Sequence, residues 1–107
     1  MIRTGRFAVG AYSELAEGEA FRVRAGGIPL AVFKVRGEIK VIEDTCSHGQ
    51  ASLSEGEVST EYCTVICPLH GSIFDLDTGE PLTAPATTSV ERFESEVEDD
   101  QIVVTII

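Results

Sequence analysis

The stretch that decides the fold runs from residue 44 to residue 72 and reads DTCSHGQASLSEGEVSTEYCTVICPLHGS. It contains both histidines and all three cysteines of the chain. Four of these form a Cys-x-His group at residues 46–48 and a Cys-x-x-His group at residues 67–70, with 18 residues between the two groups. Thiolate sulfur and imidazole nitrogen are common metal ligands. The spacing therefore predicts a metal centre held by Cys46, His48, Cys67 and His70.

Outside this stretch, apolar and polar residues alternate with period two, which is typical of antiparallel β-structure. No segment of ten or more residues has the pattern of an amphipathic helix. Arg36-Gly37-Glu38 and Asp99-Asp100 have the composition of hairpin turns. The sequence predicts an all-β barrel or sandwich of eight strands, at residues 7–11, 20–25, 30–35, 39–43, 64–67, 72–75, 89–98 and 101–107.

The alternation weakens between Glu43 and Val90, where glycine and proline accumulate. A long irregular segment inside a compact domain is usually functional or organised by a ligand. A chain of 107 residues fits one domain, so we expect residues 1–107 to form a single domain with a loop-rich insert.

The chain is strongly acidic, with a formal net charge of −10 and a pI of about 4.4. This balance argues against nucleic acid or an anionic membrane as a partner. Residues 1–43 carry seven basic and five acidic side chains, whereas residues 44–107 carry one and thirteen. The acidic half is interpreted as a solvated surface or as a docking face for a basic protein. With no secretion signal and no membrane-spanning run, we expect a cytoplasmic protein whose cysteines stay reduced.

The two Cys/His groups resemble those of the Rieske ferredoxin family, as do the CPLHGS run at residues 67–72 and the FDLDTG run at residues 74–79. The resemblance covers the whole chain and implies the Rieske fold, an antiparallel base with a cluster-binding subdomain at about residues 44–85. It further implies one [2Fe–2S] cluster per chain, with two cysteines on one iron and two histidines on the other. The assignment by position is Cys46 and Cys67 on the inner iron and His48 and His70 on the outer iron.

The family resemblance implies a one-electron carrier rather than an enzyme. Its partners would be an NAD(P)H-dependent flavoprotein ferredoxin reductase and the terminal Rieske non-haem iron oxygenase of an aromatic-ring dioxygenase system. The protein is expected to be monomeric and to bind neither nucleic acid nor membrane. The alternatives that stay open are an accessory protein like the small subunit of nitrite reductase, and a structural zinc domain.

Several single residues refine this resemblance. Ala51 and Leu69 stand where respiratory-chain Rieske proteins have two further cysteines, so no disulfide joins the loops. Ser72 matches a serine that hydrogen-bonds the cluster, whereas Phe74 replaces a tyrosine that also donates a hydrogen bond. With that donor missing, we expect a reduction potential toward the low end of the Rieske range of about −150 to +300 mV.

Three further expectations concern the surroundings of the ligands. Gly49 and Gly71 directly follow the histidines and are expected to adopt positive φ. The segment from Pro81 to Pro85 is interpreted as a stiff loop that covers the cluster, with an ordinary turn as the alternative. Cys63 is interpreted as a small core or half-buried residue without a chemical role.

Overall fold

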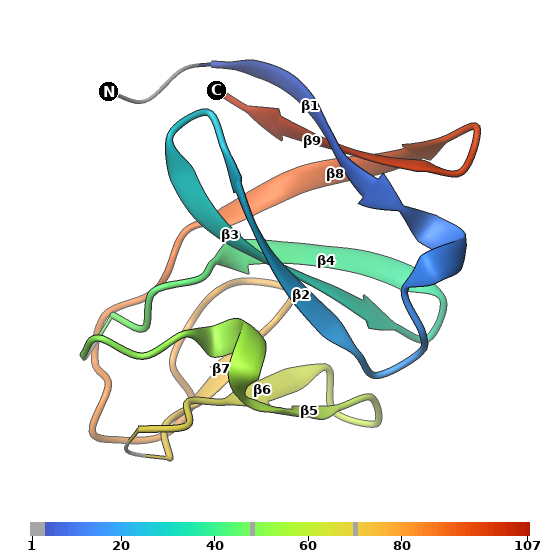
Figure 1. The fold of residues 1–107 in the computed structure, drawn as a ribbon. Helices are drawn as coiled ribbons and strands as arrows, with labels where there is room; N and C mark the ends of the chain where they lie inside the picture. Colours follow the sequence, from blue (N-terminus) through green and yellow to red (C-terminus); the bar gives the residue numbers. More distant parts are fainter. Residues whose placement is uncertain (1–3, 48, 70) are drawn as a thin grey trace.

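The computed structural model describes residues 4–47, 49–69 and 71–107 and shows two antiparallel sheets (Figure 1). The larger sheet has the strand order β1-β9-β8-β4-β3-β2, and the smaller has the order β5-β6-β7. Two short 3-10 helices, η1 (Tyr12–Glu14) and η2 (Leu53–Glu55), are the only helices in the described ranges. The strands are β1 (Gly5–Ala11), β2 (Ala20–Ala25), β3 (Ile28–Val35), β4 (Glu38–Glu43), β5 (Glu57–Ser59), β6 (Thr64–Ile66), β7 (Ile73–Asp75), β8 (Arg92–Glu98) and β9 (Gln101–Ile106).

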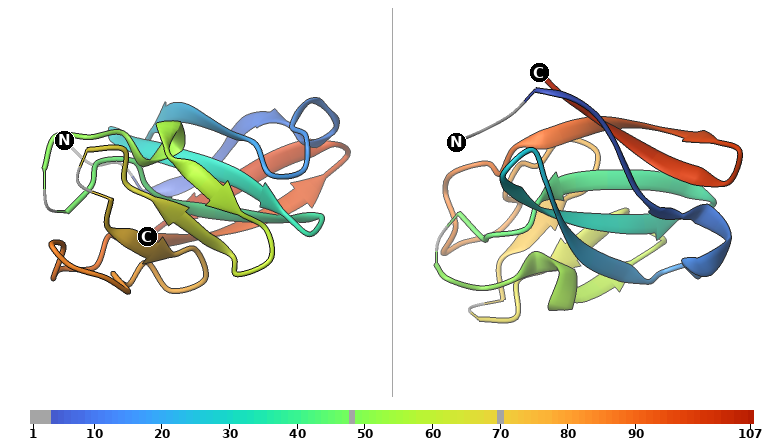
Figure 2. Two further views of the ribbon diagram at one scale, coloured as in Figure 1. Left: turned by 90° about the horizontal axis from the view of Figure 1, so that it is seen from below. Right: turned by 45° about the horizontal axis from the view of Figure 1, so that its top comes forward.

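The six-stranded sheet curls into a nearly closed barrel that forms the base of the molecule, and the small sheet lies on one side of it (Figures 1 and 2). A bulge at Val9 shifts the register between β1 and β9, which bends the strand. Across the gap between β1 and β2, the ring of Phe21 lies 3.1 Å from where a Cβ of Gly10 would be. A side chain at position 10 would therefore require the Phe21 ring to shift by a few tenths of an ångström.

Strand β3 is buried on both faces. Leu30 and Val32 belong to the barrel core, whereas Phe33 and Val35 belong to a second core that also contains residues of the small sheet and of the Cys/His loops. All four side chains are at most 1% exposed. Because successive side chains of a strand point to opposite faces, this strand needs a nearly continuous apolar run. The sequence IPLAVFKV supplies it.

The structure confirms the all-β prediction and adds one strand. Strand β5 was not predicted, since its three residues contain a single apolar side chain and depend on pairing with β6. The strand expected from Ser89 begins only at Arg92, because the N–H of Val90 donates to the carbonyl of Gly79 outside the sheet. No helix in the described part of the chain has the length and hydropathy needed to cross a bilayer.

Both predicted hairpin turns are present. Arg36 and Gly37 have φ values of 52° and 78°, and Asp99 and Asp100 have values of 50° and 66°. Two successive residues in the left-handed region are the pattern of a tight two-residue hairpin, whose twist matches that of the flanking strands.

The two cores allow a matched test of the single-domain expectation. Leu30 lies in the barrel core and Leu76 in the second core, and their side chains are 0% and 1% exposed. We expect Leu30→Ala and Leu76→Ala each to lower the free energy of unfolding by about 2–5 kcal/mol. Because β3 contributes to both cores, denaturation followed by fluorescence and circular dichroism should show one coincident transition in each variant.

The control is Val97→Ala, at a side chain that is 45% exposed, which should change stability by less than about 0.5 kcal/mol. Separate transitions for the barrel and the small sheet would contradict the single domain.

Candidate metal centre

The two cysteines of the predicted ligand set lie in loops that leave the ends of strands and enter the same core. Cys46 follows β4 and Cys67 follows β6, and they are 4% and 2% exposed. Both belong to the second core, together with Leu53, Val65 and Phe74. The structure therefore brings the predicted sulfur ligands into one apolar environment, whereas His48 and His70 lie outside the described residues.

The two cysteine loops close in the same way, through their own backbone. The N–H of Cys46 donates to the carbonyl of Ala51 at 2.9 Å, and the N–H of Cys67 donates to the carbonyl of Ser72 at 2.7 Å, five residues later in each case. The carbonyl of each cysteine accepts the N–H of a glycine in the same loop. Both cysteine backbones are thus hydrogen-bonded while buried, as buried main-chain groups require.

The expectation of positive φ is confirmed for Gly71 and wrong for Gly49. Gly71 has a φ of 78°, whereas Gly49 is not among the residues with positive φ. A Cβ at position 49 would lie 3.1 Å from Cδ2 of Leu69, so a side chain there would make the Leu69 side chain shift slightly. The missing side chain lets the Leu69 side chain of the second loop pack against the first.

The proline-containing segment is fastened to both cysteine loops. Leu82 donates its N–H to the carbonyl of Ile73 at 2.7 Å, and the hydroxyl of Thr83 accepts the N–H of Ile73 at 2.9 Å. At the other end of the segment, the hydroxyl of Ser47 donates to the carbonyl of Thr88. These bonds hold residues 82–88 beside β7 and the first cysteine loop, and the covering role expected for Pro81–Pro85 stays a prediction.

Ser72 and Phe74 are both fully buried beside the second cysteine loop. The Ser72 hydroxyl oxygen accepts the N–H of Ala86 at 2.9 Å, which ties the loop to the proline segment and leaves the hydroxyl proton for another acceptor. Phe74 fills the core with an aromatic ring that has no hydrogen-bond donor. A low reduction potential therefore remains a prediction, which rests on the absence of a hydroxyl donor on Phe74.

Cys63 is a core residue, which is the first of the two positions that the sequence predicted, core or half-buried. It lies in the turn between β5 and β6 and is 3% exposed. Burial is the main cause that raises the pKa of its thiol above the ordinary value. A raised pKa disfavours the thiolate, which is the form that binds metal.

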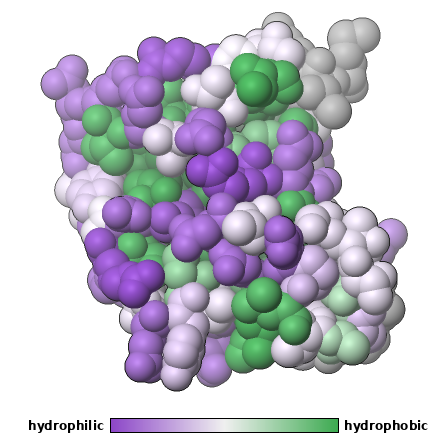
Figure 3. Space-filling model, turned by 180° about the vertical axis from the view of Figure 1, so that it is seen from behind, coloured by the Kyte–Doolittle hydropathy of each residue, from purple (hydrophilic) through white to green (hydrophobic). Residues whose placement is uncertain are grey.

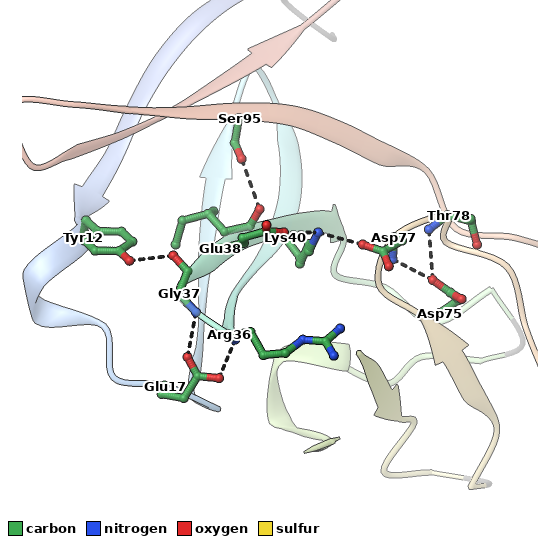
Figure 4. Close-up of polar contacts among 11 residues, drawn as sticks. Tyr12, Glu17, Arg36, Gly37, Glu38, Lys40, Asp75, Asp77, Thr78 and Ser95 are labelled. Atoms are coloured by element: carbon green, nitrogen blue, oxygen red, sulfur yellow. Dashed lines mark hydrogen bonds and ion pairs between the residues drawn. The ribbon is translucent and has the colours of Figure 1, made fainter. Parts of the chain in front are cut away.

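A polar network ties the small sheet to the base barrel (Figure 4). Lys40 on β4 forms ion pairs with Asp77, at 2.7 Å, and with Glu38, at 3.0 Å. Asp77 lies in the turn after β7, where Asp75 accepts the backbone N–H groups of Asp77 and Thr78. Hydrogen bonding with Lys40 lowers the pKa of Asp77, and hydrogen bonding with Asp77 raises the pKa of Lys40.

The three loops around the site carry no Asp, Glu, Lys or Arg, over residues 45–51, 67–72 and 81–90. Two of the most exposed apolar side chains lie in them, Leu69 at 53% and Leu82 at 54%. In Figure 3 the molecule is seen from behind, so this end comes to the lower right, where the surface is mostly pale and of intermediate hydropathy. The acidic charge therefore lies outside these three loops.

No role was predicted from the sequence for one buried acidic residue, Asp44. Asp44 is 2% exposed and lies two residues before Cys46. Its oxygens accept hydrogen bonds from Ser52 and Ser54 and form an ion pair with Arg22. The signal available in the sequence was an acidic residue directly after an apolar strand and two residues before the first cysteine.

The described residues fit the group that the family resemblance implies. Two buried sulfurs, set in loops whose backbone bonds are already satisfied, match the cysteine half of a Rieske ligand set. The segment that follows the second loop is hydrogen-bonded to both cysteine loops, through Ser47 and Ser72, and so lies beside them.

Comparison with known proteins agrees with this chemistry. A family model described as the Rieske [2Fe–2S] domain matches residues 5–94. Ferredoxin CarAc of Metapseudomonas resinovorans is 41% identical over 95 residues, which cover 88% of this chain and 87% of the relative. The 3-phenylpropionate/cinnamic acid dioxygenase ferredoxin subunit of Escherichia coli K12 is 40% identical over 94 residues, with coverage of 88% and 87%.

Solved structures show the same fold. The ferredoxin of carbazole 1,9a-dioxygenase from Nocardioides aromaticivorans IC177 superposes with a TM-score of 0.91 at 27% identity, covering 94% of this chain and 96% of that one. A ferredoxin seen in complex with the oxygenase of carbazole 1,9a-dioxygenase gives a TM-score of 0.86 at 40% identity, with coverage of 94% and 92%.

The chain belongs to the Rieske [2Fe–2S] domain family. It has the Rieske fold and carries a Rieske [2Fe–2S] cluster, which decides against the structural zinc domain. It is an electron-carrying ferredoxin of the type found in aromatic dioxygenase systems, and not itself an oxygenase.

The Lys40–Asp77 pair yields a prediction about pH. Asp77 has a lowered pKa in the folded state, so its contribution is complete above the unfolded value of about 3.9 and is lost only as the pH falls through the lowered value. Lys40 has a raised pKa, so its contribution is complete below about 10.4 and is lost as the pH rises through the raised value. We expect Asp77→Asn to lower the free energy of unfolding by less than about 1 kcal/mol, equally from pH 6 to pH 9.

Denaturant titrations at several pH values measure this difference. Asp99→Asn, at an exposed carboxylate whose positive φ asparagine also accepts, controls for the loss of one negative charge. A cost of Asp77→Asn that changes across this pH window would contradict the pairing.

Proposed function

We propose that the protein carries single electrons from an NAD(P)H-dependent flavoprotein reductase to the terminal Rieske non-haem iron oxygenase of an aromatic-ring dioxygenase system in the cytoplasm. The cluster is held by Cys46, His48, Cys67 and His70. The observation that carries the ligand assignment is the matching backbone closure of the two cysteine loops, which buries both cysteines in one core. The complex formed by a 40% identical carbazole dioxygenase ferredoxin with its oxygenase supports the acceptor.

Each part of the chain has a role in this proposal. The bound cluster supplies a centre that accepts and gives up one electron. Cys46 and Cys67, which are buried in the second core, would supply its two thiolate ligands, and His48 and His70 would supply its two imidazole ligands. The proline segment keeps water from one side, through its bonds to both cysteine loops.

The docking surface in this proposal is the uncharged end formed by the three loops. Leu69 and Leu82 expose apolar surface there, and aliphatic side chains of this kind favour close, dehydrated contact with a partner. The acidic side chains outside the three loops act at longer range and steer a basic partner toward the molecule. Both features serve rapid association followed by release.

The complete ligand set separates this proposal from an accessory protein like the small subunit of nitrite reductase. An accessory role needs no redox centre, whereas the chain keeps both cysteines, buried and oriented, and both histidines in sequence.

Electron paramagnetic resonance of the dithionite-reduced protein tests the proposal, with iron and acid-labile sulfide measured on the same sample. We expect a low-average-g Rieske signal with about two irons and two sulfides per chain. A spectrum typical of all-cysteine ligation would contradict the histidine ligands. Absence of any signal would remove the electron-carrier role.

Cysteine variants test the ligand assignment. Cys46→Ala and Cys67→Ala should each abolish the signal, because each removes a thiolate ligand. Cys63→Ala is the matched control, since Cys63 is equally buried in the same core, and it should keep the iron and sulfide content of the wild type. Loss of the cluster in Cys63→Ala alone would reassign the sulfur ligands.

Partner docking is tested with Leu82→Ser. We expect the second-order rate of electron transfer to the oxygenase, measured by stopped flow, to fall at least about fivefold, because an apolar contact residue is replaced by a polar one. Val97→Ser, at a comparably exposed residue of β8, should leave the rate unchanged. Added salt should slow wild type and both variants by the same factor, since screening acts on the acidic surroundings. Equal rates for Leu82→Ser and Val97→Ser would place the docking surface elsewhere.

A further inference from the structure

Asp44 is a buried carboxylate near the site whose oxygens have three partners. Its side chain is 3% exposed. Its Oδ1 accepts the backbone N–H of Ser54 at 2.9 Å, and its Oδ2 accepts the hydroxyl of Ser52 and pairs with Nε of Arg22 at 3.1 Å. Burial of a carboxylate is costly unless donors surround it, so this arrangement needs all three partners.

The backbone of Asp44 is held as firmly as its side chain. Its N–H donates to the carbonyl of Pro29 at 2.9 Å, and its carbonyl accepts the N–H of Leu53 at 2.7 Å. Directly after it, Thr45 forms a bridge with Ser52. Asp44 therefore joins the base barrel to both ends of the loop that carries Cys46.

The three donors to the Asp44 carboxylate, two side chains and one backbone N–H, come from two different parts of the fold. Arg22 lies on β2 of the barrel, and its side chain is 57% exposed, so the ion pair reaches from the surface to the buried carboxylate. Ser54 lies in η2 and Ser52 directly precedes it, where the cysteine loop returns to the core. A shift of Asp44 would consequently move the start and the end of residues 45–51 together.

We propose that Asp44 is a positioning residue that fixes the loop bearing Cys46 and His48 against the barrel, and that it thereby governs how firmly the cluster is retained. This inference rests on the proposed ligation by those two residues. Asp44 acts on the cluster only through the loop, and its hydrogen bonds play the part that outer partners play for metal ligands generally.

Two variants separate the hydrogen bonds from the charge. Asp44→Asn removes the negative charge and leaves an amide group facing donors. Ser52→Ala removes one donor and keeps the carboxylate and its ion pair. Asp77→Asn is the matched control, because it also removes one negative charge and an ion pair, but at a turn with no hydrogen bond to the Cys46 loop among the described residues.

The readouts are the g values of the reduced holoprotein, the midpoint potential, and the rate of cluster loss, followed by bleaching of the visible absorbance in the presence of an iron chelator. We expect Asp44→Asn to lose its cluster about tenfold faster than wild type, to shift the g values, and to raise the midpoint potential, since a nearby negative charge no longer opposes reduction. Ser52→Ala should also lose its cluster faster and shift the g values, with a smaller change in potential. Asp77→Asn should lower only the unfolding temperature.

The outcomes are distinct. Wild-type g values and wild-type cluster retention in both Asp44→Asn and Ser52→Ala, together with a lower unfolding temperature, would overturn the positioning role and leave Asp44 a residue of the fold alone. If Asp44→Asn does not fold, Ser52→Ala decides the question by the same measurements. A wild-type protein without a Rieske signal would overturn the proposed function itself.

Discussion

The burial of β3 on both faces is the constraint on which the rest of the molecule depends. Leu30 and Val32 pack into the barrel, and Phe33 and Val35 pack against the small sheet and the cysteine loops. Neither core can be assembled without this strand, so the orientation of the ligand-bearing part relative to the barrel is set by the pleat of one strand. The Lys40–Asp77 ion pair adds a second, polar connection between the same two parts.

Much of this architecture follows from the pattern of the sequence. Alternation at period two predicts the strands of the barrel, and the left-handed turns at Arg36-Gly37 and Asp99-Asp100 follow from their composition. Strand β5 escaped prediction because Glu57–Ser59 has no apolar pattern of its own and is defined by its partner β6. Local sequence carries no signal for a strand that exists only through pairing.

The ligand-bearing part of the chain shows the same difference between features that local sequence predicts and features that depend on contacts between distant segments. The spacing of cysteine and histidine indicates the ligands, because the loop chemistry is local in sequence. Asp44 was missed because its role depends on Arg22, which is distant in sequence and reaches it only in the folded barrel. The positive φ predicted for Gly49 was wrong, and the structure instead shows Leu69 of the other loop close to Gly49. Sequence reasoning fails where two separate segments meet.

The backbone closure of the two cysteine loops has a consequence for how such proteins diversify. Since main-chain groups close each loop, through the N–H and carbonyl of each cysteine, the intervening positions Gln50, Pro68 and Leu69 are not needed for loop closure. Side chains at these positions are then available to vary with the identity of the protein that docks. A substitution at one of these positions would therefore alter the surface of the loops without breaking the backbone hydrogen bonds that close them.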